Sequence, residues 1–551
     1  MANAQGGAAT GAAVVVAAMR AAGTTRIFGV PGGGSSLDLI AAAKAAGLPF
    51  VLARQETAAM IMAATTAELT GTPGAVLVTR GPGVGNAANG MAQAALDRAP
   101  VLLLADGFTE AERAFANHQF FDHAAMLAPV SKGAAKLTGP RSAAGATAAE
   151  LLARAMAAPR GPVLLELTAA AARGESAPLP EIAQPVPEIA QPVPAVAPEL
   201  GAACRLLAEA RRPVVIAGLE ATNPAACTAL RRLIATLGCP ALVTYKAKGV
   251  VPDADPLFGG VFTGGEAEAP LLREADLILL AGADPVEFIP QPWRYAVPVL
   301  DLGTAPRPLH YQAPAVAAYG ALAPMLERLA AGAGRSTWTM GEIAAHRTAW
   351  LRALANAPGG NGGLSPQAVV ELAQAACRRA GADPRVAVDA GAHMFPATTF
   401  WQAARPGDLL ISNGLATMGF ALPAGIAAAL HDPARGAVAF TGDGGLLMAL
   451  GELATAATLG AKLVVVVFND ASLSLIDIKT DSRVLPEGAL GWPEADFAAV
   501  MTALGGIGLR AADEAAYAAA LDQALAAPGP VLVDVRVDPG SYPAQIKALR
   551  G

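Results

Sequence analysis

The chain has 551 residues, so it is too long for one compact unit and allows three or four domains of roughly 100 to 200 residues each. Its formal charge is -6, from 39 basic and 45 acidic side chains. The basic residues form no cluster of the kind that neutralises phosphates, which argues against nucleic-acid binding. Apolar residues make up 54% of the chain, but alanine supplies much of that share. No uninterrupted run of about 18 apolar residues is present to cross a bilayer, so we expect no membrane partner.

Short apolar runs bounded by Gly or Pro alternate with Ala-rich helical stretches, and each run is a predicted strand. In the N-terminal part the predicted strands are Arg26 to Val30, Phe50 to Ala53, Ala75 to Thr79, Val101 to Ala105 and Val163 to Leu167. In the middle part they are Val214 to Ala217, Ala241 to Thr244, Leu277 to Ala281 and Val297 to Leu300. In the C-terminal part they are Val386 to Asp389, Asp408 to Ser412, Ala437 to Thr441, Leu463 to Phe468 and Val531 to Val535. Strands this apolar are buried on both faces, as parallel strands covered by helices are. The sequence therefore predicts an α/β protein with three doubly wound, parallel-sheet domains.

Two segments rich in proline or glycine are predicted to divide these parts. Residues 178–198 are Pro-rich and carry an exact tandem repeat, Pro180 to Val186 followed by Pro187 to Val193. Proline at this density prevents helix and interior strand, which predicts an extended linker. A second linker is predicted over 336–365, where Ala357 to Pro366 combines Gly clusters with Pro. We therefore expect domains at 1–177, 199–335 and 366–551.

The four cysteines form neither a metal-binding nor a disulfide pattern. Cys204, Cys227, Cys239 and Cys377 show no CxxC spacing and no paired framework. We therefore expect no structural zinc, no disulfide scaffold and a reducing, cytoplasmic location.

The most informative stretch, Thr441-Gly-Asp-Gly-Gly445, follows one predicted strand and opens a helix, and the next predicted strand ends at Asn469. Because the carboxyl ends of parallel strands lie side by side, Asp443 and Asn469 can converge on one cation. Their side-chain oxygens and the backbone carbonyl of Ala471 would form half of an octahedral Mg²⁺ shell, which diphosphate oxygens and water can complete. The residues whose N–H groups would approach that diphosphate at a helix N-terminus are Gly442, Gly444 and Gly445. The alternative interpretation is an ordinary glycine turn.

At these residues the sequence resembles the thiamine diphosphate enzymes of the acetohydroxyacid synthase and benzoylformate decarboxylase superfamily, and the resemblance covers almost the whole chain. It implies a pyrimidine-binding domain, a central domain and a diphosphate-binding domain in that order. It also implies that Asp443, Asn469 and the Ala471 carbonyl hold Mg²⁺ and, through it, the cofactor.

Arg54-Gln-Glu-Thr-Ala-Ala59 follows the predicted strand Phe50 to Ala53. By position alone, Glu56 is a first-turn carboxylate that stabilises the helix dipole. The resemblance implies a catalytic role instead, since the family places Arg-His-Glu or a close variant here. That glutamate hydrogen-bonds N1′ of the aminopyrimidine and can hold or donate its proton.

Asn413 to Pro423 is similar to the family's Gly-Leu-Gly-Thr-Met-Gly-Phe segment. The resemblance implies that Met418 wedges between the two cofactor rings and that the backbone at Ala416 and Met418 contacts the pyrimidine. Ala416 stands where the family usually has Gly. Without the motif, Met418 would be core filler.

Asp389 to Met394 resembles the family's Gly-Gln-His diphosphate segment. It retains Gly391 and His393, both assigned to the cofactor, and replaces Gln by Ala392. The alternative for His393 is an ordinary polar loop residue.

The loop Thr79 to Asn86 matches the family's Thr-Ser-Gly-Pro-Gly segment, except that Arg80 replaces a small Ser. The resemblance places this loop beside the reacting carbon. Arg80 therefore either binds an acidic substrate group through a bidentate contact or pairs with a carboxylate across a subunit contact. Gly33, after the first predicted strand, is also assigned to the substrate.

Asn117 to His123 is in register with a family segment reading Ala-Phe-Gln-Glu. Gln119 matches and is assigned to catalysis, while His118 replaces an active-site Phe and is a candidate acid or base. The alternative is a loop histidine bonded to Asp122. The benzoylformate decarboxylase pattern would place a catalytic His at Thr79, and its absence argues against that enzyme's specificity.

Ser472 to Thr480 should line the site, with Leu473 and Ile476 as substrate contacts and the residues to about Trp492 as a lid loop. A helix packing face would give the same pattern.

We therefore expect a thiamine diphosphate- and Mg²⁺-dependent decarboxylase or carboligase that acts on a 2-oxo acid, with an aldehyde or oxo acid as acceptor where ligation follows. The first alternative is an acetolactate synthase-like transferase, which the replacements at Arg80 and His118 disfavour. A flavin-containing oxidase relative is the second; the central block lacks the Arg usual in flavin-binding members, so FAD is not expected. A non-catalytic cofactor-binding protein is the third. The resemblance implies a homodimer or homotetramer, in which Glu56 and Asp443 of one site belong to different chains.

Overall fold

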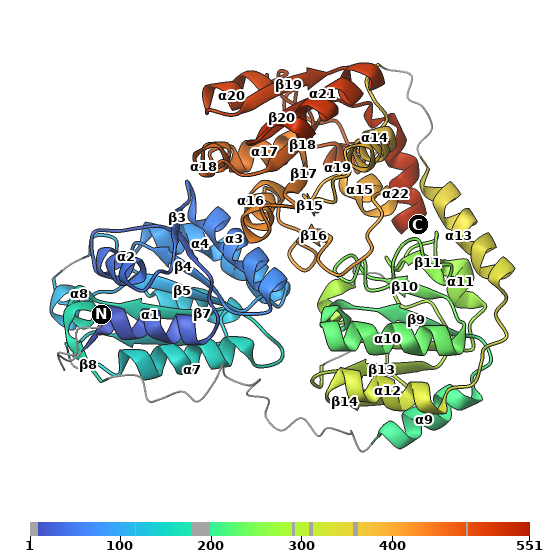
Figure 1. The fold of residues 1–551 in the computed structure, drawn as a ribbon, viewed down its shortest axis with the longest axis horizontal. Coiled ribbons are helices and arrows are strands. Elements are labelled where there is room, and N and C mark those ends of the chain that lie inside the picture. Colours follow the sequence, from blue (N-terminus) through green and yellow to red (C-terminus); the bar gives the residue numbers. More distant parts are fainter. Residues whose placement is uncertain are drawn as a thin grey trace. The chain divides into compact units, whose positions relative to one another are not determined.

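The computed structural model describes residues 9–115, 117–140, 142–177, 199–288, 292–307, 312–355, 362–480 and 483–550 (Figure 1). The described chain separates into two compact units. The first holds the described part of Met1–Gln191 with Ile426–His431 and Ala449–Leu459, and the second holds the described part of Pro192–Gly425 with Asp432–Met448 and Gly460–Gly551. The predicted linker 178–198 lies outside the described residues.

The first unit contains a six-stranded parallel sheet in the order β3-β2-β4-β5-β7-β6. Its strands are β2 (Ile27–Val30), β3 (Phe50–Leu52), β4 (Gly74–Val78), β5 (Val101–Asp106), β6 (Ala134–Leu137) and β7 (Val163–Leu167). A separate antiparallel pair joins β1 (Ala9–Thr10) and β8 (Glu175–Ser176). The helices are α1 (Gly11–Ala21), α2 (Ser35–Ala45), α3 (Glu56–Thr70), α4 (Pro82–Leu96), α5 (Glu110–Arg113), α6 (His123–Leu127), η1 (Ala128–Val130), α7 (Ala144–Met156) and α8 (Ala169–Arg173).

Helices cover both faces of this sheet. Leu77 and Leu104 point to one face, where they share a buried cluster with residues of α1, α2, α7 and α8. Val76 and Leu103, the alternate residues of the same strands, are also fully buried, and α3 and α4 contact these strands (Figure 1). Burial of both faces explains why the strands are apolar at every position rather than at every second one.

The second unit contains two six-stranded parallel sheets. The middle sheet has the order β11-β10-β9-β12-β13-β14. Its strands are β9 (Pro213–Ala217), β10 (Ala241–Val243), β11 (Phe258–Val261), β12 (Leu277–Ala281), β13 (Val299–Gly303) and β14 (Val316–Tyr319). Its helices are α9 (Leu200–Glu209), η2 (Leu219–Thr222), α10 (Pro224–Leu237), α11 (Ala269–Arg273), η3 (Pro285–Glu287), α12 (Leu322–Gly332) and α13 (Met340–Leu354).

The C-terminal sheet has the order β16-β15-β17-β18-β20-β19. Its strands are β15 (Arg385–Val388), β16 (Leu409–Ile411), β17 (Ala437–Gly442), β18 (Leu463–Asn469), β19 (Ile507–Ala511) and β20 (Val531–Arg536). The helices along this stretch of sequence, of which α18 and the end of α16 belong to the first unit, are α14 (Pro366–Arg379), α15 (Met394–Phe400), α16 (Ala421–His431), α17 (Asp443–Ala449), α18 (Glu452–Leu459), α19 (Ser474–Asp477), α20 (Phe497–Ala503), α21 (Glu514–Ala526), η4 (Pro539–Ser541) and α22 (Tyr542–Arg550).

The predicted fold class is confirmed: the chain is an α/β protein with three parallel sheets. The strands of these sheets that sequence analysis missed are β6, β11, β14 and β19, and all four are edge strands. Three of them are partly exposed, and the fourth, Phe258-Gly-Gly-Val261, contains two glycines. An edge strand does not need apolar residues on every position, so it lacks the continuous run that marks an interior strand.

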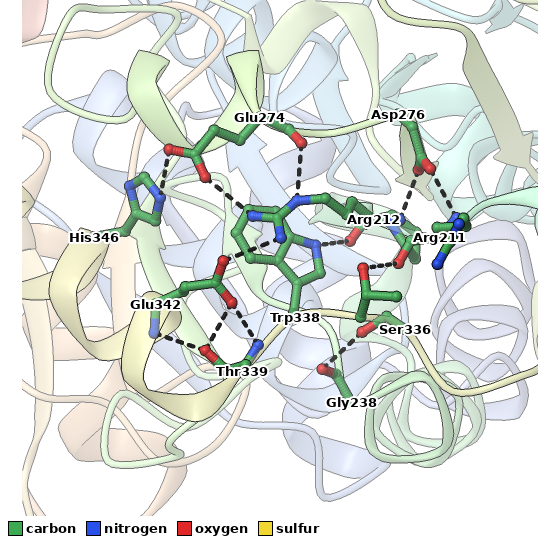
Figure 2. Close-up of polar contacts among 12 residues, drawn as sticks. Arg211, Arg212, Gly238, Glu274, Asp276, Ser336, Trp338, Thr339, Glu342 and His346 are labelled. Atoms are coloured by element: carbon green, nitrogen blue, oxygen red, sulfur yellow. Dashed lines mark hydrogen bonds and ion pairs between the residues drawn. The ribbon is translucent and has the colours of Figure 1, made fainter.

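Helix α13 lies within 336–365, which sequence analysis assigned to a linker. The guanidinium of Arg212, just before β9, lies 3.7 Å from the centroid of the Trp338 ring and pairs with Glu274 at 3.0 Å and Glu342 at 3.1 Å (Figure 2). Thr339 and Glu342 form a capping box that starts the helix. This sequence signal was overlooked, and the helix packs on the middle sheet. Residues 356–361 of the predicted linker lie outside the described residues.

Two expectations from composition concern cysteines and membrane spans. All four cysteines are free thiols. In the part of the chain that the structure describes, no helix combines the length and apolar character needed to span a bilayer.

Candidate active site

Glu56 is the first residue of α3 and is buried, with 7% of its surface exposed. Asn86 Nδ2, from α4, donates a hydrogen bond to Glu56 Oε2 at 3.0 Å. The carbonyl of Asn86 in turn accepts from Thr57 Oγ1 at 2.5 Å. These two bonds tie α3 to α4 and hold the carboxylate in one orientation, which a simple helix cap would not require.

Arg80 lies in the turn between β4 and α4, and its guanidinium is engaged inside the first unit. Its Nη1 is 3.3 Å from Glu112 Oε1, and its Cζ is 4.1 Å from the centroid of the Phe108 ring. Glu112 also accepts hydrogen bonds from the backbone and side chain of Thr109. The backbone bond, the side-chain bond and Arg80 together hold the pKa of Glu112 below its usual range. Arg80 thus pairs with a carboxylate of its own unit, and its side chain remains about one-third exposed.

His118 and Gln119 lie on an exposed segment between α5 and α6. Gln119 adopts φ +60°, and its carbonyl oxygen would lie 2.4 Å from a Cβ placed on Gly81. Asp122, the alternative partner of His118, accepts from Ala125 N and caps α6.

Gly33 lies in the exposed loop between β2 and α2, and nothing lies within 4 Å of a Cβ built on it. The Gly33 loop, the start of α3 with Glu56, the Arg80 turn and the segment with Gln119 follow β2, β3, β4 and β5, which belong to one parallel sheet. They therefore share its carboxyl edge, where open α/β sheets bind ligands.

In the second unit, β17 and β18 are adjacent, and their register pairs Gly442 with Phe468. Asp443 directly follows Gly442, and Asn469 directly follows Phe468. Both residues therefore lie at the carboxyl edge of the sheet. Asp443 Oδ1 accepts from Gly444 N at 2.8 Å, and its Oδ2 accepts from Ala471 N at 2.6 Å. The three residues assigned to Mg²⁺ are thus brought together by two neighbouring strand ends.

Burial raises the pKa of Asp443 to about 7, and the negative charge of Asp470 adds to the effect. Burial also raises the pKa of Asp470 itself. A buried and a partly buried carboxyl group in this position repel each other when both are ionised, and a divalent cation would offset that cost.

The amide of Asn469 is oriented by its neighbour, since Nδ2 donates to Asp534 Oδ1 at 2.8 Å. Among the described residues, its Oδ1 receives one long contact, from Arg536 Nη1 at 3.4 Å. Ala471 adopts φ +58°, and its carbonyl accepts from Trp492 N at 3.1 Å, which leaves the oxygen a second lone pair. The described residues contain no group of three or more His, Cys, Asp or Glu arranged for a metal, and the set above, with one carboxylate, differs from that pattern.

Close packing leaves little room for a side chain at the glycines of the turn. A Cβ on Gly445 would lie 2.6 Å from Asp389 Oδ2, one on Gly444 would lie 3.0 Å from Leu473 Cδ2, and one on Gly442 would lie 3.2 Å from His393 Cε1. The turn therefore presents bare backbone at the start of α17.

His393 is 4% exposed, and its ring stacks on Phe468 with 5.3 Å between centroids. A Cβ on Gly391 would lie 2.7 Å from His393 Cε1. Burial lowers the pKa of His393 to about 3, so the imidazole is neutral. Its Nε2 is buried and finds no hydrogen-bond partner among the described residues. An unpaired buried nitrogen beside a glycine turn and a carboxylate pair fits a diphosphate held with a divalent cation.

Asp389 is a further candidate site residue, which sequence analysis quoted only as part of a motif. It is fully buried and accepts from Gly419 N and Phe420 N, each at 3.1 Å, and from Thr441 Oγ1 at 2.9 Å. Burial raises its pKa to about 6. Asp389 thereby joins the strand end before His393, the Met418 loop and the glycine turn. A carboxylate at the end of a buried strand was the available signal.

Ala416 adopts φ +53°, a left-handed conformation that favours glycine and costs other residues free energy. Met418 is half-buried, and its Cε would lie 3.5 Å from a Cβ on Gly444. The methionine therefore reaches the glycine turn.

Leu473 is half-buried beside the same turn, whereas Ile476 on α19 is about half exposed. The ends of the predicted lid are pinned, because Leu473 N donates to Leu490 O at 2.7 Å and Trp492 N donates to Ala471 O. Residues 481 and 482 of this segment lie outside the described residues.

The fold and these two sets of residues are compatible with a thiamine pyrophosphate enzyme, and the family matches bear this class out. The family's N-terminal TPP binding domain matches residues 9–126, its central domain matches residues 200–329, and its C-terminal TPP binding domain matches residues 389–535. The chain belongs to this family.

Among its relatives, the probable 2-ketoarginine decarboxylase AruI of Pseudomonas aeruginosa is 31% identical over 482 residues, covering 82% of this chain and 81% of the relative. The acetolactate synthase of Bacillus subtilis is 29% identical over 551 residues, covering 96% of this chain and 93% of the relative. The catabolic acetolactate synthase of Raoultella terrigena is 29% identical over 545 residues, covering 96% of this chain and 95% of the relative. The thiamine diphosphate-dependent 4-hydroxybenzoylformate decarboxylase of Rhodococcus jostii RHA1 has the same fold, with a TM-score of 0.81 at 21% identity over 96% of this chain and 99% of that one.

Proposed function

We propose that the protein is a Mg²⁺- and thiamine diphosphate-dependent enzyme that decarboxylates a 2-oxo acid. It then releases an aldehyde or joins the remaining carbon unit to a second carbonyl compound. The observation that carries this proposal is the convergence of Asp443, Asn469 and Ala471 beside a glycine turn and the unpaired Nε2 of His393.

In this proposal Asp443, the Asn469 amide oxygen and the Ala471 carbonyl hold Mg²⁺, and the backbone of the glycine turn holds the diphosphate. A neutral His393 with its proton on Nε2 donates to the same group. When bound, thiamine diphosphate supplies an electron sink for breaking the bond next to a ketone carbonyl.

Glu56 holds or donates the proton exchanged with the aminopyrimidine ring, and Asn86 keeps its carboxylate in place. Because Glu56 belongs to the first unit and Asp443 to the second, we propose that each active site uses Glu56 of one chain and Asp443 of another, in a homodimer or homotetramer. Mass measurement in solution by light scattering tests this: a monomer with full activity excludes it.

Product analysis tests the reaction. The protein, supplied with Mg²⁺ and thiamine diphosphate, is incubated with pyruvate, benzoylformate and longer 2-oxo acids, with and without an acceptor aldehyde. We expect CO₂ release that E56Q lowers by at least about a hundredfold, as removal of a general acid or base does. The matched control is E110Q, since Glu110 on α5 is 74% exposed. Full cofactor binding with no turnover of any 2-oxo acid would favour a non-catalytic role.

A second candidate is acetolactate synthesis, favoured by two relatives of that name which each align with 96% of this chain. With pyruvate alone, this candidate predicts acetolactate as the main product, whereas decarboxylation without ligation predicts acetaldehyde. His118 and Arg80, which replace the expected Phe and Ser, favour the first. We also propose a cytoplasmic location and no FAD; a yellow purified protein would contradict the latter.

A further inference from the structure

His123 is a buried histidine that the proposed chemistry does not use. It begins α6 and is 2% exposed. Its Nε2 accepts a hydrogen bond from the backbone N–H of Gly81 at 3.0 Å. Its Nδ1 lies 3.2 Å from Glu166 Oε2, within ion-pair distance although outside hydrogen-bond geometry.

We propose that His123 is a positioning residue, which anchors the turn before α4 through the Gly81 amide and so sets the places of Arg80 and Gln119. The inference rests on the proposed function for its activity readout only. Its structural readouts are independent of any substrate.

The contacts define the tautomer of the imidazole. A nitrogen that accepts from an N–H group carries no proton, so the proton of the neutral ring is on Nδ1. Nδ1 lies 3.2 Å from Glu166 Oε2, and the negative charge of that carboxylate favours a proton on this nitrogen electrostatically. The two partners of His123 therefore act together: Glu166 selects the tautomer, and that tautomer supplies the acceptor for Gly81.

Glu166 is itself unusual, because it lies inside β7, in the otherwise apolar run Val163–Leu167, and is buried. A carboxylate inside a buried strand costs free energy unless it is paired. His123 is the partner that the structure gives it, which indicates a specific role rather than chance placement.

The hydrogen bond from the Gly81 N–H to His123 acts on the candidate substrate loops. Gly81 adopts φ +65°, and a Cβ placed on it would lie 2.4 Å from the carbonyl oxygen of Gln119. Arg80 precedes Gly81 directly. One imidazole from the start of α6 thus holds the loop after β4 against the segment that carries Gln119. Loss of the acceptor would leave the Gly81 amide buried and unpaired, and the turn would shift to solvate it.

Two substitutions of His123 distinguish the loss of the Gly81 hydrogen bond from a general loss of packing. The side-chain oxygen of glutamine reaches the position of histidine Nε2, whereas asparagine reaches only that of Nδ1. H123Q therefore retains an acceptor for Gly81, and H123N loses it. Hydrogen exchange of the Gly81 amide, followed by mass spectrometry on peptides spanning 79–86, should be slow in the native protein and in H123Q. In H123N we expect exchange at least about tenfold faster, as for a lost hydrogen bond.

The activity readout is the division between KM and kcat for the best 2-oxo acid. We expect H123N to raise KM or lower kcat/KM about tenfold or more and H123Q to stay within about threefold, with Mg²⁺-dependent thiamine diphosphate binding by calorimetry unchanged in both. H346N and H346Q are the control pair, since His346 pairs with Glu274 far along the chain in the second unit.

Two results would overturn the inference. One is equal loss in H123Q and H123N that follows only their melting temperatures, which indicates packing. The other is a ¹⁵N NMR signal for His123 with the proton on Nε2. If the native protein turns over no 2-oxo acid, the proposed function fails, while exchange at Gly81 and the tautomer still decide the inference.

Discussion

Asn86 and Glu56, thirty residues apart, are joined by a hydrogen bond from Nδ2 to Oε2. N86A removes the donor and leaves the carboxylate free to rotate. A hydrogen bond to a charged group contributes about 1.5–3 kcal/mol, so we expect kcat to fall about tenfold to a hundredfold with little change in KM. The control T57V removes only the bond to the Asn86 carbonyl. Because both changes act on one group, N86A in an E56Q background should add almost nothing; full additivity would show that Asn86 acts elsewhere.

Removal of the divalent cation should destabilise the second unit and abolish cofactor binding. A ligand that binds only the folded state raises stability, so Mg²⁺ with thiamine diphosphate should raise the melting temperature of the native protein, and a chelator should reverse the rise. D443N is expected to lose the response, because its amide cannot replace the carboxylate charge. D477N, an exposed carboxylate on α19, should retain it. A D443N protein that responds to Mg²⁺ like the native one would exclude Asp443 as a ligand.

Glu287 gives the middle sheet a defined pH dependence. Burial raises its pKa from 4.5 to about 7, although it accepts from Leu219 N and Asp284 N. At pH values between 4.5 and about 7, Glu287 is mostly deprotonated in the unfolded chain but keeps its proton in the folded chain. The free energy of unfolding therefore falls as pH rises from 4.5 towards 7.

E287Q does not titrate at this position, so the unfolding free energy of the native protein minus that of E287Q should fall over that window and level off above it. Denaturant unfolding at a series of pH values measures it, with the exposed Glu327→Gln as control. A pH-independent difference would show that the Glu287 carboxyl is not perturbed.

Ala416 stores backbone strain that glycine would release. A left-handed conformation costs a residue with a Cβ roughly 1–2 kcal/mol, and glycine loses about 0.5–1 kcal/mol more entropy on folding. We expect A416G to stabilise the protein by up to about 1 kcal/mol in denaturant unfolding. A434G, at an exposed turn without positive φ, should destabilise it slightly. Destabilisation by both would refute strain at Ala416.

Arg80 should act on substrate choice despite its pairing with Glu112, since one 3.3 Å contact engages only one of its donors. We expect R80S to raise KM for 2-oxo acids with a second carboxylate several-fold more than KM for pyruvate, as the loss of a charge-assisted contact does. R113S, on the neighbouring α5, is the control. An unchanged preference would leave Arg80 only its pairing with Glu112.

Sequence alone determined the interior strands and the fold class, because burial on both faces leaves a continuous apolar run that needs no knowledge of neighbours. It also placed Asp443 and Asn469 at strand ends, since parallel order brings those ends together. Four of the six edge strands of the parallel sheets, β6, β11, β14 and β19, escaped it, because one side of an edge strand is free of the packing that imposes such runs.

The tertiary structure decided the contacts between residues distant in sequence. Nothing local distinguishes Asn86 from other helical asparagines or His123 from a loop histidine, and Arg80 shows no preference for Glu112 until α5 folds beside it. Hydrogen bonds and ion pairs act over a few ångströms and depend on the direction of each side chain. Only the packed positions of whole helices and strands bring such atoms into range.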